Sequence, residues 1–347
     1  MNLQGIGIVF SGGRGLAALD RSLTGAWTPP VPLAIPERDS AVPAYAIPAD
    51  ALADKTALKA MRRADRFGKI ATLAAWDAWH DAGLADLDET ARARTGIVLG
   101  SALGPHVTTF RFLDDILAYG DTEVSPTAFS HSVHNAAVSY VATRLGIRGP
   151  ALTVTDFHFS LPYALLQARI WLSNGRCDRV LVGTTDELGT VMGYIARHKM
   201  RIPTDGHIRP EAFSSQPAAV PGEAGVFFLV DHGTTPGTYG RIDKVAVPDA
   251  EPDTSPTDSL LYDANGLLSD ETPYRALCAE ARERSTDCVS HADRFGSVPS
   301  GLSLHLAAAA LALKHTAPDS AAPLRRIACV KLNGRGQRAT ISANRQP

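Results

Sequence analysis

The sequence predicts a layered α/β protein, in which buried strands are covered by helices on both faces. Short apolar runs rich in β-branched residues alternate along the 347 residues with longer stretches of helical periodicity. Several of the short runs are apolar throughout, which is typical of strands buried on both faces. The expected strands are 5–10, 95–100, 152–156, 179–185, 225–230, 242–247, 259–263, 288–291, 327–332 and 339–343.

Six helices are predicted, and several of their ends carry recognisable signals. Gly146 and Gly175 each follow the last turn of a predicted helix, where glycine is favoured. Ser160 is a predicted N-cap, and Pro162 fits the first turn that follows it. A long loop rich in Pro, Gly and Ser is expected at 200–225. The expected helices are 69–83, 107–120, 134–146, 160–175, 271–284 and 300–315.

Composition argues against several classes of protein. The net charge is −2 and no Lys/Arg run is long enough to bind nucleic acid. The N-terminal residues do not read as a signal peptide, and the longest apolar run, 304–313, is too short to cross a bilayer. We therefore expect a soluble, cytoplasmic protein with no membrane partner. The cysteines lack metal-site spacing and are expected to be reduced, buried thiols: Cys177, Cys278, Cys288 and Cys329.

Two motifs that suggest ligand binding lack residues that such sites require. The stretch GIGIVFSGGRG (5–15) lacks the third glycine and the acidic residue of a dinucleotide fingerprint, so it predicts a tight turn after the first strand. His131 and His134 have the i, i+3 spacing of a metal-binding pair, but no carboxylate or cysteine stands nearby. We expect neither a metal nor a cofactor.

The stretch TVTDFHFSLPYALLQARIW (153–171) passes from a strand into a helix, and its turn carries Asp156, His158 and Ser160. Residues two apart in an extended chain lie about 6.5–7 Å apart at Cα. A catalytic triad needs contacts of about 2.6–3.2 Å, and Ser160 also lacks the flanking glycines of a nucleophile elbow. A serine hydrolase is therefore disfavoured.

The order of several longer motifs resembles the β-ketoacyl synthases over nearly the whole chain. SPTAFSHSVHNAAVSYVATRLGIRGPALTVTD, followed by NGRCDRVLVGTTDE, is similar to the N-terminal half of that family. RPEAFSSQPAAVPGEAGVFFLV (209–230), SVPSGLSLHLAAAALAL and KLNGRGQRATI (331–341) resemble later family motifs. The resemblance implies the thiolase fold, a five-layered αβαβα arrangement of two similar halves. The halves would be residues 1–235 and a shortened 236–347.

The catalytic cysteine of the family has no counterpart here. The family presents it between a strand and a helix, in contexts such as TVDTACSSS, and this chain has His158 in that place. A helix N-terminus favours a thiolate and disfavours a protonated imidazole, so His158 is predicted to be neutral.

The other catalytic positions are altered as well. The family's first histidine, in HGTGT, corresponds to the segment 262–271, which contains no histidine. The second, in GHxxGA, is replaced by Ser297, and the preceding lysine falls near Ala292 or Asp293. The FGFGG loop becomes NGRGQ, with Arg335 in place of the gating phenylalanine. No catalytic residue is expected.

The resemblance implies a chain length factor of a type II polyketide synthase, closest to the aryl-polyene and highly reducing type. Such a subunit would pair with a cysteine-bearing ketosynthase and shape the acyl tunnel, while acyl carrier protein docks mainly on the partner. Two alternatives stay open: an acyltransferase or condensing enzyme using His158 or Ser160, and a homodimeric acyl-thioester-binding protein. The expected pocket residues are Phe157, His158, Phe159 and Arg335. The expected interface residues are Leu152, Thr153, Val154, Thr155, Asp156, Phe129, His131, His134 and Asn135.

Overall fold

The strands fall into two sets of five that share one topology. The computed structural model describes residues 1–35, 40–59, 61, 63–120, 122, 124–248, 250, 253, 255–315 and 324–346. The first set has the order β6 (Ala151–Thr155), β5 (Thr95–Ser101), β7 (Arg179–Asp186), β8 (Ala224–Asp231), β1 (Asn2–Phe10). The second set has the order β11 (Asp287–Val289), β10 (Ser259–Tyr262), β12 (Arg326–Leu332), β13 (Arg338–Asn344), β9 (Arg241–Ala246).

Strand directions repeat as well as strand order. β8 runs antiparallel to both β1 and β7, and β13 runs antiparallel to both β9 and β12. The remaining two strands of each set are parallel to β7 or β12. The two sets meet at one pair of residues, Asn2 and Arg241. This repetition agrees with the prediction of two similar halves.

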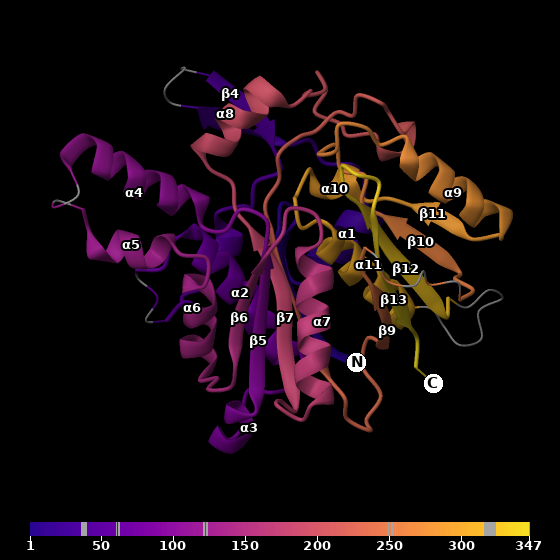
Figure 1. The fold of residues 1–347 in the computed structure, drawn as a ribbon, viewed down its shortest axis with the longest axis horizontal. Helices are drawn as coiled ribbons and strands as arrows, with labels where there is room; N and C mark the ends of the chain where they lie inside the picture. The colour runs from indigo at the N-terminus through magenta and orange to yellow at the C-terminus, as the bar shows by residue number, and fades with distance from the viewer. Residues whose placement is uncertain are drawn as a thin grey trace.

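Helices separate and cover the two sets of strands, which gives five layers (Figure 1). α7 (Ser160–Ser173) and α11 (Leu302–His315) lie between the sets, and their apolar side chains share one core with both. α2 (Arg66–Asp81) and α6 (Ala136–Leu145) cover the outer face of the first set. α9 (Pro273–Glu283) covers the second. The predicted αβαβα order is thus confirmed.

Two glycines of the rejected dinucleotide motif explain how α2 packs. A Cβ added to Gly7 of β1 would lie 1.9 Å from the Ala74 carbonyl oxygen of α2. A Cβ added to Gly5 would lie 2.3 Å from the Ala78 carbonyl oxygen. The motif therefore allows close packing between a helix and a strand. The turn predicted after it is present, since Phe10 pairs with Gly13 of β2 (Gly13–Arg14).

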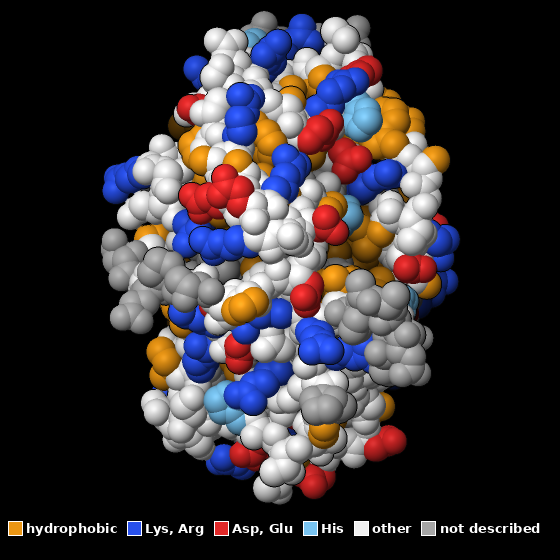
Figure 2. Space-filling view, turned by 90° about the vertical axis from the view of Figure 1, so that its right-hand side faces the viewer, with side chains coloured by type: hydrophobic (Ala, Val, Ile, Leu, Met, Phe, Trp, Pro, Cys, Tyr) orange, Lys and Arg blue, Asp and Glu red, His pale blue; other side chains and the backbone are white. Residues whose placement is uncertain are grey.

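The second half is short, because its described residues include no counterpart of α2. β9 ends at Ala246 and β10 begins at Ser259, and the described part of the connection contains no helix. The described part of this connection makes polar contacts with β12 and β13 instead, because the Asp253 carboxylate accepts hydrogen bonds from Ser342 and Arg326. On the face of the second half, Figure 2 shows acidic and basic side chains interspersed, in keeping with the net charge of −2.

All ten predicted strands and all six predicted helices are present, most with ends shifted by one to three residues. The four cysteines are free thiols, as predicted, and all except the half-buried Cys288 are buried. Among the described helices, none combines the length and apolar character needed to span a bilayer. The shorter elements went unpredicted: α1 (Leu16–Thr24), β3 (Val31–Ile35), β4 (Ser40–Ala44), α3 (Glu89–Ala93), α5 (Pro126–Ser132), α8 (Thr190–Lys199) and α10 (Ala292–Phe295).

Candidate functional site

The turn before α7 is capped by an aspartate rather than by the predicted serine. The Asp156 carboxylate accepts the backbone N–H groups of His158 at 2.9 Å and Phe159 at 2.6 Å. Phe159 occupies the N-cap position, and Ser160 is a buried first residue of the helix, so the N-cap prediction was wrong. Because Asp156 bonds to the backbone and not to the imidazole, the turn does not hold a catalytic triad.

The imidazole of His158 lies between two phenylalanines. Its ring centroid is 5.0 Å from that of Phe157, which is exposed, and 6.1 Å from that of Phe159, which is buried. Burial lowers the pKa of His158, and the positive charge of Lys331 lowers it further. The imidazole is therefore neutral at physiological pH and has the environment of a packed aromatic ring.

A buried ion pair lies close enough to influence His158, and the sequence analysis did not find it. Lys331 of β12 donates hydrogen bonds to Asp263 at 2.5 Å and to the Pro299 carbonyl at 2.6 Å. His305 of α11 lies 3.9 Å from the same carboxylate. The sequence contains one signal of this ion pair. Lys331 lies inside the apolar run IACVKL, and the strand that pairs with it is followed by Asp263.

Breaking this pair should destabilise the protein strongly. Lys331→Met is expected to cost about 3–5 kcal/mol, because it leaves the Asp263 carboxylate buried without a counter-charge. The double variant Lys331→Met/Asp263→Leu should be more stable than Lys331→Met alone. Urea unfolding monitored by circular dichroism measures both, with the exposed Lys199→Met as control. A loss below about 1 kcal/mol in Lys331→Met would contradict the assignment.

Ser297, which the sequence resemblance places at the position of a family histidine, forms hydrogen bonds with the backbone. Its hydroxyl donates to the Asn265 carbonyl and accepts the Val220 N–H at 3.0 Å. Asn265 lies in the segment expected to correspond to the other family histidine, and its amide donates to the Val298 carbonyl at 2.8 Å. Both side chains are buried, so the two altered positions have been brought together as packing contacts.

Every residue expected at a subunit interface is at least partly exposed. β6 is the edge strand of the first set, and Thr153 on it donates to the His134 carbonyl at 3.5 Å. His131 forms a 2.7 Å hydrogen bond with Tyr140. Of the expected pocket residues, Arg335 lies exposed on the turn between β12 and β13.

Exposed apolar side chains adjoin this edge, and those of the helix 106–119 were not among the expected interface residues. α4 (His106–Tyr119) and α5 project from the first half (Figure 1), and the ring of Phe112 lies 5.6 Å from that of Phe129. Six apolar side chains of these two helices and the adjoining strand are exposed, and we call this set the apolar face: Phe110, Leu113 and Leu117 of α4, Phe129 of α5, Val133 just after it, and Leu152 of β6. An exposed apolar surface of this kind marks an interaction site.

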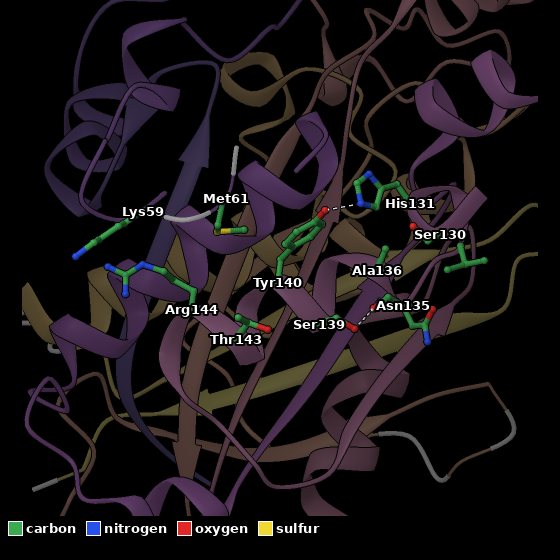
Figure 3. A pocket seen from close by; sticks show the side chains of 11 residues that line it. Lys59, Met61, Ser130, His131, Asn135, Ala136, Ser139, Tyr140, Thr143 and Arg144 are labelled. Carbon is green, nitrogen blue, oxygen red and sulfur yellow. Dashed lines mark hydrogen bonds between the residues drawn. The ribbon is translucent and has the colours of Figure 1, made fainter. Parts of the chain in front are cut away.

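A cavity of about 520 Å³ opens beside the apolar face, along α6 (Figure 3). Lys59 and Arg144 lie at one end, and the hydrogen-bonded His131 and Tyr140 lie along the wall. Arg144 is held in place, because its guanidinium stacks on Trp76 at 3.7 Å and donates to two backbone carbonyls. Within the part of the chain that the structure describes, no group of three or more His, Cys, Asp or Glu could hold a metal ion.

Sequence comparison identifies relatives of the first half. Residues 5–233 match the family described as β-ketoacyl synthase, N-terminal domain. A 3-oxoacyl-acyl-carrier-protein synthase 2 from Coxiella burnetii (strain RSA 493 / Nine Mile phase I) is 26% identical over 136 residues, which covers 39% of this chain and 33% of that protein. Nodulation protein E from Rhizobium meliloti (strain 1021) is 31% identical over 122 residues, covering 35% and 30%. The chain thus aligns with about a third of each of these relatives.

Solved structures share the fold over the whole chain. The ishigamide ketosynthase/chain length factor has a TM-score of 0.76 at 20% identity, covering 100% of this chain and 99% of its own. A β-ketoacyl synthase from Burkholderia phymatum STM815 has a TM-score of 0.73 at 16% identity, with the same coverage. AntDE:AntF, a type II polyketide synthase ketosynthase with its acyl carrier protein, has a TM-score of 0.72 at 14% identity, covering 99% of each chain. Together with the match over residues 5–233, this shared fold shows that the chain belongs to the β-ketoacyl synthase family.

Proposed function

We propose that this chain is a non-catalytic subunit, of the chain-length-factor type, that pairs with a cysteine-bearing ketosynthase. The observation that carries the proposal is the turn before α7. Its nucleophile position holds His158, a neutral imidazole packed between Phe157 and Phe159. Condensation needs a thiolate to hold the acyl chain and donors to stabilise the developing oxyanion.

The other positions of the family's catalytic set support the same conclusion. Ser297 and Asn265 are buried and engaged in hydrogen bonds with the backbone, so neither is free to polarise a substrate. We place the boundary between the two halves at residue 235, with the shortened half contributing these two residues and the Lys331–Asp263 pair.

The first half supplies the surface for a partner. An edge strand leaves a row of backbone groups unpaired, and β6 is such a strand. β6 adjoins the apolar face, because Thr153 contacts His134, the residue that follows Val133. A row of unpaired backbone groups beside exposed apolar side chains suits pairing with a second ketosynthase-like chain. In the pair, the segment Phe129–Asn135 would lie near the partner's active site.

The chemistry of elongation would then be shared between the subunits. Phe157, His158 and Phe159 would help close the acyl tunnel, because close-packed bulky side chains limit its length, and Arg335 would lie near its mouth. Acyl carrier protein would dock mainly on the partner. We assign the assembly to type II polyketide synthesis of the polyene type.

Co-purification tests the proposal directly. The full chain is co-expressed with a cysteine-bearing ketosynthase encoded beside it and examined by native mass spectrometry. We expect a one-to-one complex and, after incubation with acyl-loaded carrier protein, an acyl adduct on the partner only.

The two alternative functions predict different adducts or assemblies. An adduct on this chain, mapped to His158 or Ser160, would support an acyltransferase or condensing enzyme and overturn our proposal. A stable homodimer that binds acyl-CoA in the absence of any ketosynthase would support an acyl-thioester-binding protein.

A further inference from the structure

A second buried polar cluster lies under the first turn of α4, away from the turn before α7. Glu187 follows β7 and is 3% exposed, and His106, the first residue of α4, is 7% exposed. One Glu187 oxygen accepts the Val107 N–H of α4 at 3.1 Å. The other oxygen and both His106 ring nitrogens have no hydrogen-bond partner within the described residues. Leaving buried polar atoms unpaired costs about 1–3 kcal/mol each, so this arrangement calls for an explanation.

The two side chains lie close together but form no direct hydrogen bond. His106 Nδ1 lies 3.9 Å from Glu187 Oε1, the oxygen that also accepts the Val107 N–H, and this distance is too long for a direct hydrogen bond. Glu187 connects the end of β7 to α4 through its hydrogen bond with Val107. No other side chain at the end of β7 forms a hydrogen bond with α4 among the described residues. The protonation state of Glu187 therefore bears on how the first turn of α4 is held.

The charged groups around the pair are mostly acidic. Asp65, at the start of α2, accepts a 2.9 Å hydrogen bond from Thr108 of α4. Glu223, before β8, accepts the Leu188 N–H at 2.9 Å and pairs with Arg66. Asp186, the last residue of β7, completes the set and accepts hydrogen bonds from the Ser101 hydroxyl at the end of β5 and from the next backbone N–H. Three carboxylates and one guanidinium thus surround Glu187 and His106.

These surroundings favour the uncharged forms of both groups. Burial, followed by the negative charge of Asp65, raises the pKa of Glu187 to about 8. Burial lowers the pKa of His106, against an opposing effect of Asp186. At pH 7 Glu187 therefore carries its proton, and the His106 imidazole is uncharged.

We propose that Glu187 and His106 form a proton-dependent anchor for α4, which sets the pH range in which the apolar face is presented to a partner. The link between this anchor and a partner rests on the proposed function. Phe110, Leu113 and Leu117 of the apolar face all belong to α4. Deprotonation leaves a buried carboxylate beside Asp65 and Glu223, and their repulsion favours opening of the first turn to water.

The direction of the pH effect follows from the pKa values. The pKa of Glu187 is raised from its ordinary 4.5 to about 8, so the folded state holds a proton that the unfolded state has lost in this window. Its contribution to stability is complete below about pH 4.5 and is lost as the pH rises through about 8. His106 acts in the opposite sense, because a lowered pKa gives stability that is lost on acidification. Raising the pH through about 8 should therefore weaken the attachment of α4 at its first turn.

Hydrogen–deuterium exchange of the α4 peptides, corrected for intrinsic rates, tests the anchor in the full chain. Between pH 7.5 and 9 the protection of α4 should fall about tenfold in the parent, since each pH unit above the pKa reduces the protonated form tenfold. Glu187→Gln, a neutral isostere, should keep its protection. Glu271→Gln is the matched control, because Glu271 is also buried with a pKa raised to about 7 but lies in the second half. It should behave as the parent does.

Unchanged α4 protection in the parent, or an equal loss in Glu187→Gln, would overturn the anchor. Ketosynthase binding is measured at the same pH values, with weaker binding at pH 9 expected in the parent only. If α4 loosens and no ketosynthase binds at any pH, the anchor stands and the proposed pairing function fails. If binding occurs but is equally strong at both pH values, the link between the anchor and the partner is refuted.

Discussion

Thr153→Pro is expected to weaken pairing of this chain with the proposed ketosynthase partner without unfolding it. The Pro150 carbonyl and the Asp156 N–H both bond to β5. Because alternate residues of a strand direct their backbone groups to the same side, Thr153 directs its N–H to the free edge of β6. Proline removes that N–H and is tolerated in edge strands. The substitution therefore acts on the outer edge and spares the ladder with β5.

The expected effect is a loss of about 1–3 kcal/mol in pairing, which corresponds to a complex about 5- to 150-fold weaker. Analytical ultracentrifugation of the co-expressed pair measures it. Thr153→Val is the matched control, since it keeps the N–H and the branched shape and should bind as the parent does.

A second substitution tests the apolar face independently of the backbone. Leu152→Asp places a charge on a side chain that is 39% exposed in the isolated chain, and should also abolish pairing. Val289→Asp, on the opposite edge strand β11, is 39% exposed too and should have no effect. If all four variants co-purify with the ketosynthase in equal yield, β6 is not the pairing edge.

Gly7→Ala is expected to unfold much of the first half. The added Cβ would lie 1.9 Å from the Ala74 carbonyl oxygen and 2.4 Å from the Ala78 nitrogen, both backbone atoms of α2. Neither atom can move without shifting the whole buried helix, so the cost should exceed about 3 kcal/mol. Since domains of this kind are stable by about 5–15 kcal/mol, the melting temperature should fall sharply.

Gly334→Ala provides the control for glycine replacement. A Cβ at Gly334 meets nothing within 4 Å, so its stability should stay within about 0.5 kcal/mol of the parent. Thermal unfolding by differential scanning calorimetry compares the two. A Gly7→Ala variant within about 1 kcal/mol of the parent would show that α2 can retreat from β1.

The major elements could be predicted because their periodicity is local. A buried strand such as 179–185 is apolar at nearly every position, and this pattern survives any tertiary context. The β3–β4 hairpin was missed because Pro32 and Pro43 lie in it and proline argues against a strand. The hairpin forms a separate two-stranded sheet, in which no neighbouring strand needs the missing N–H groups.

The site was harder to predict, because its chemistry depends on residues far apart in the chain. The capping of α7 was assigned to Ser160, the nearest suitable side chain, whereas Asp156 reaches back over the turn. The Glu187–His106 cluster joins residues 81 positions apart and has no motif. Its significance comes from burial and from three nearby carboxylates, which only the packing brings together.

By itself, the sequence determined the layered α/β class, the order of the major elements and the absence of cysteine at the turn before α7. Those features depend on residue identity and on short-range periodicity. The tertiary structure decided that Ser297 is a packing contact and that Lys331 influences His158. It also decided that β6 has an unpaired edge and that α4 exposes apolar side chains. Burial and electrostatic fields arise from side chains that converge in space, and their effects on pKa and hydrogen bonding exist only once the chain has folded.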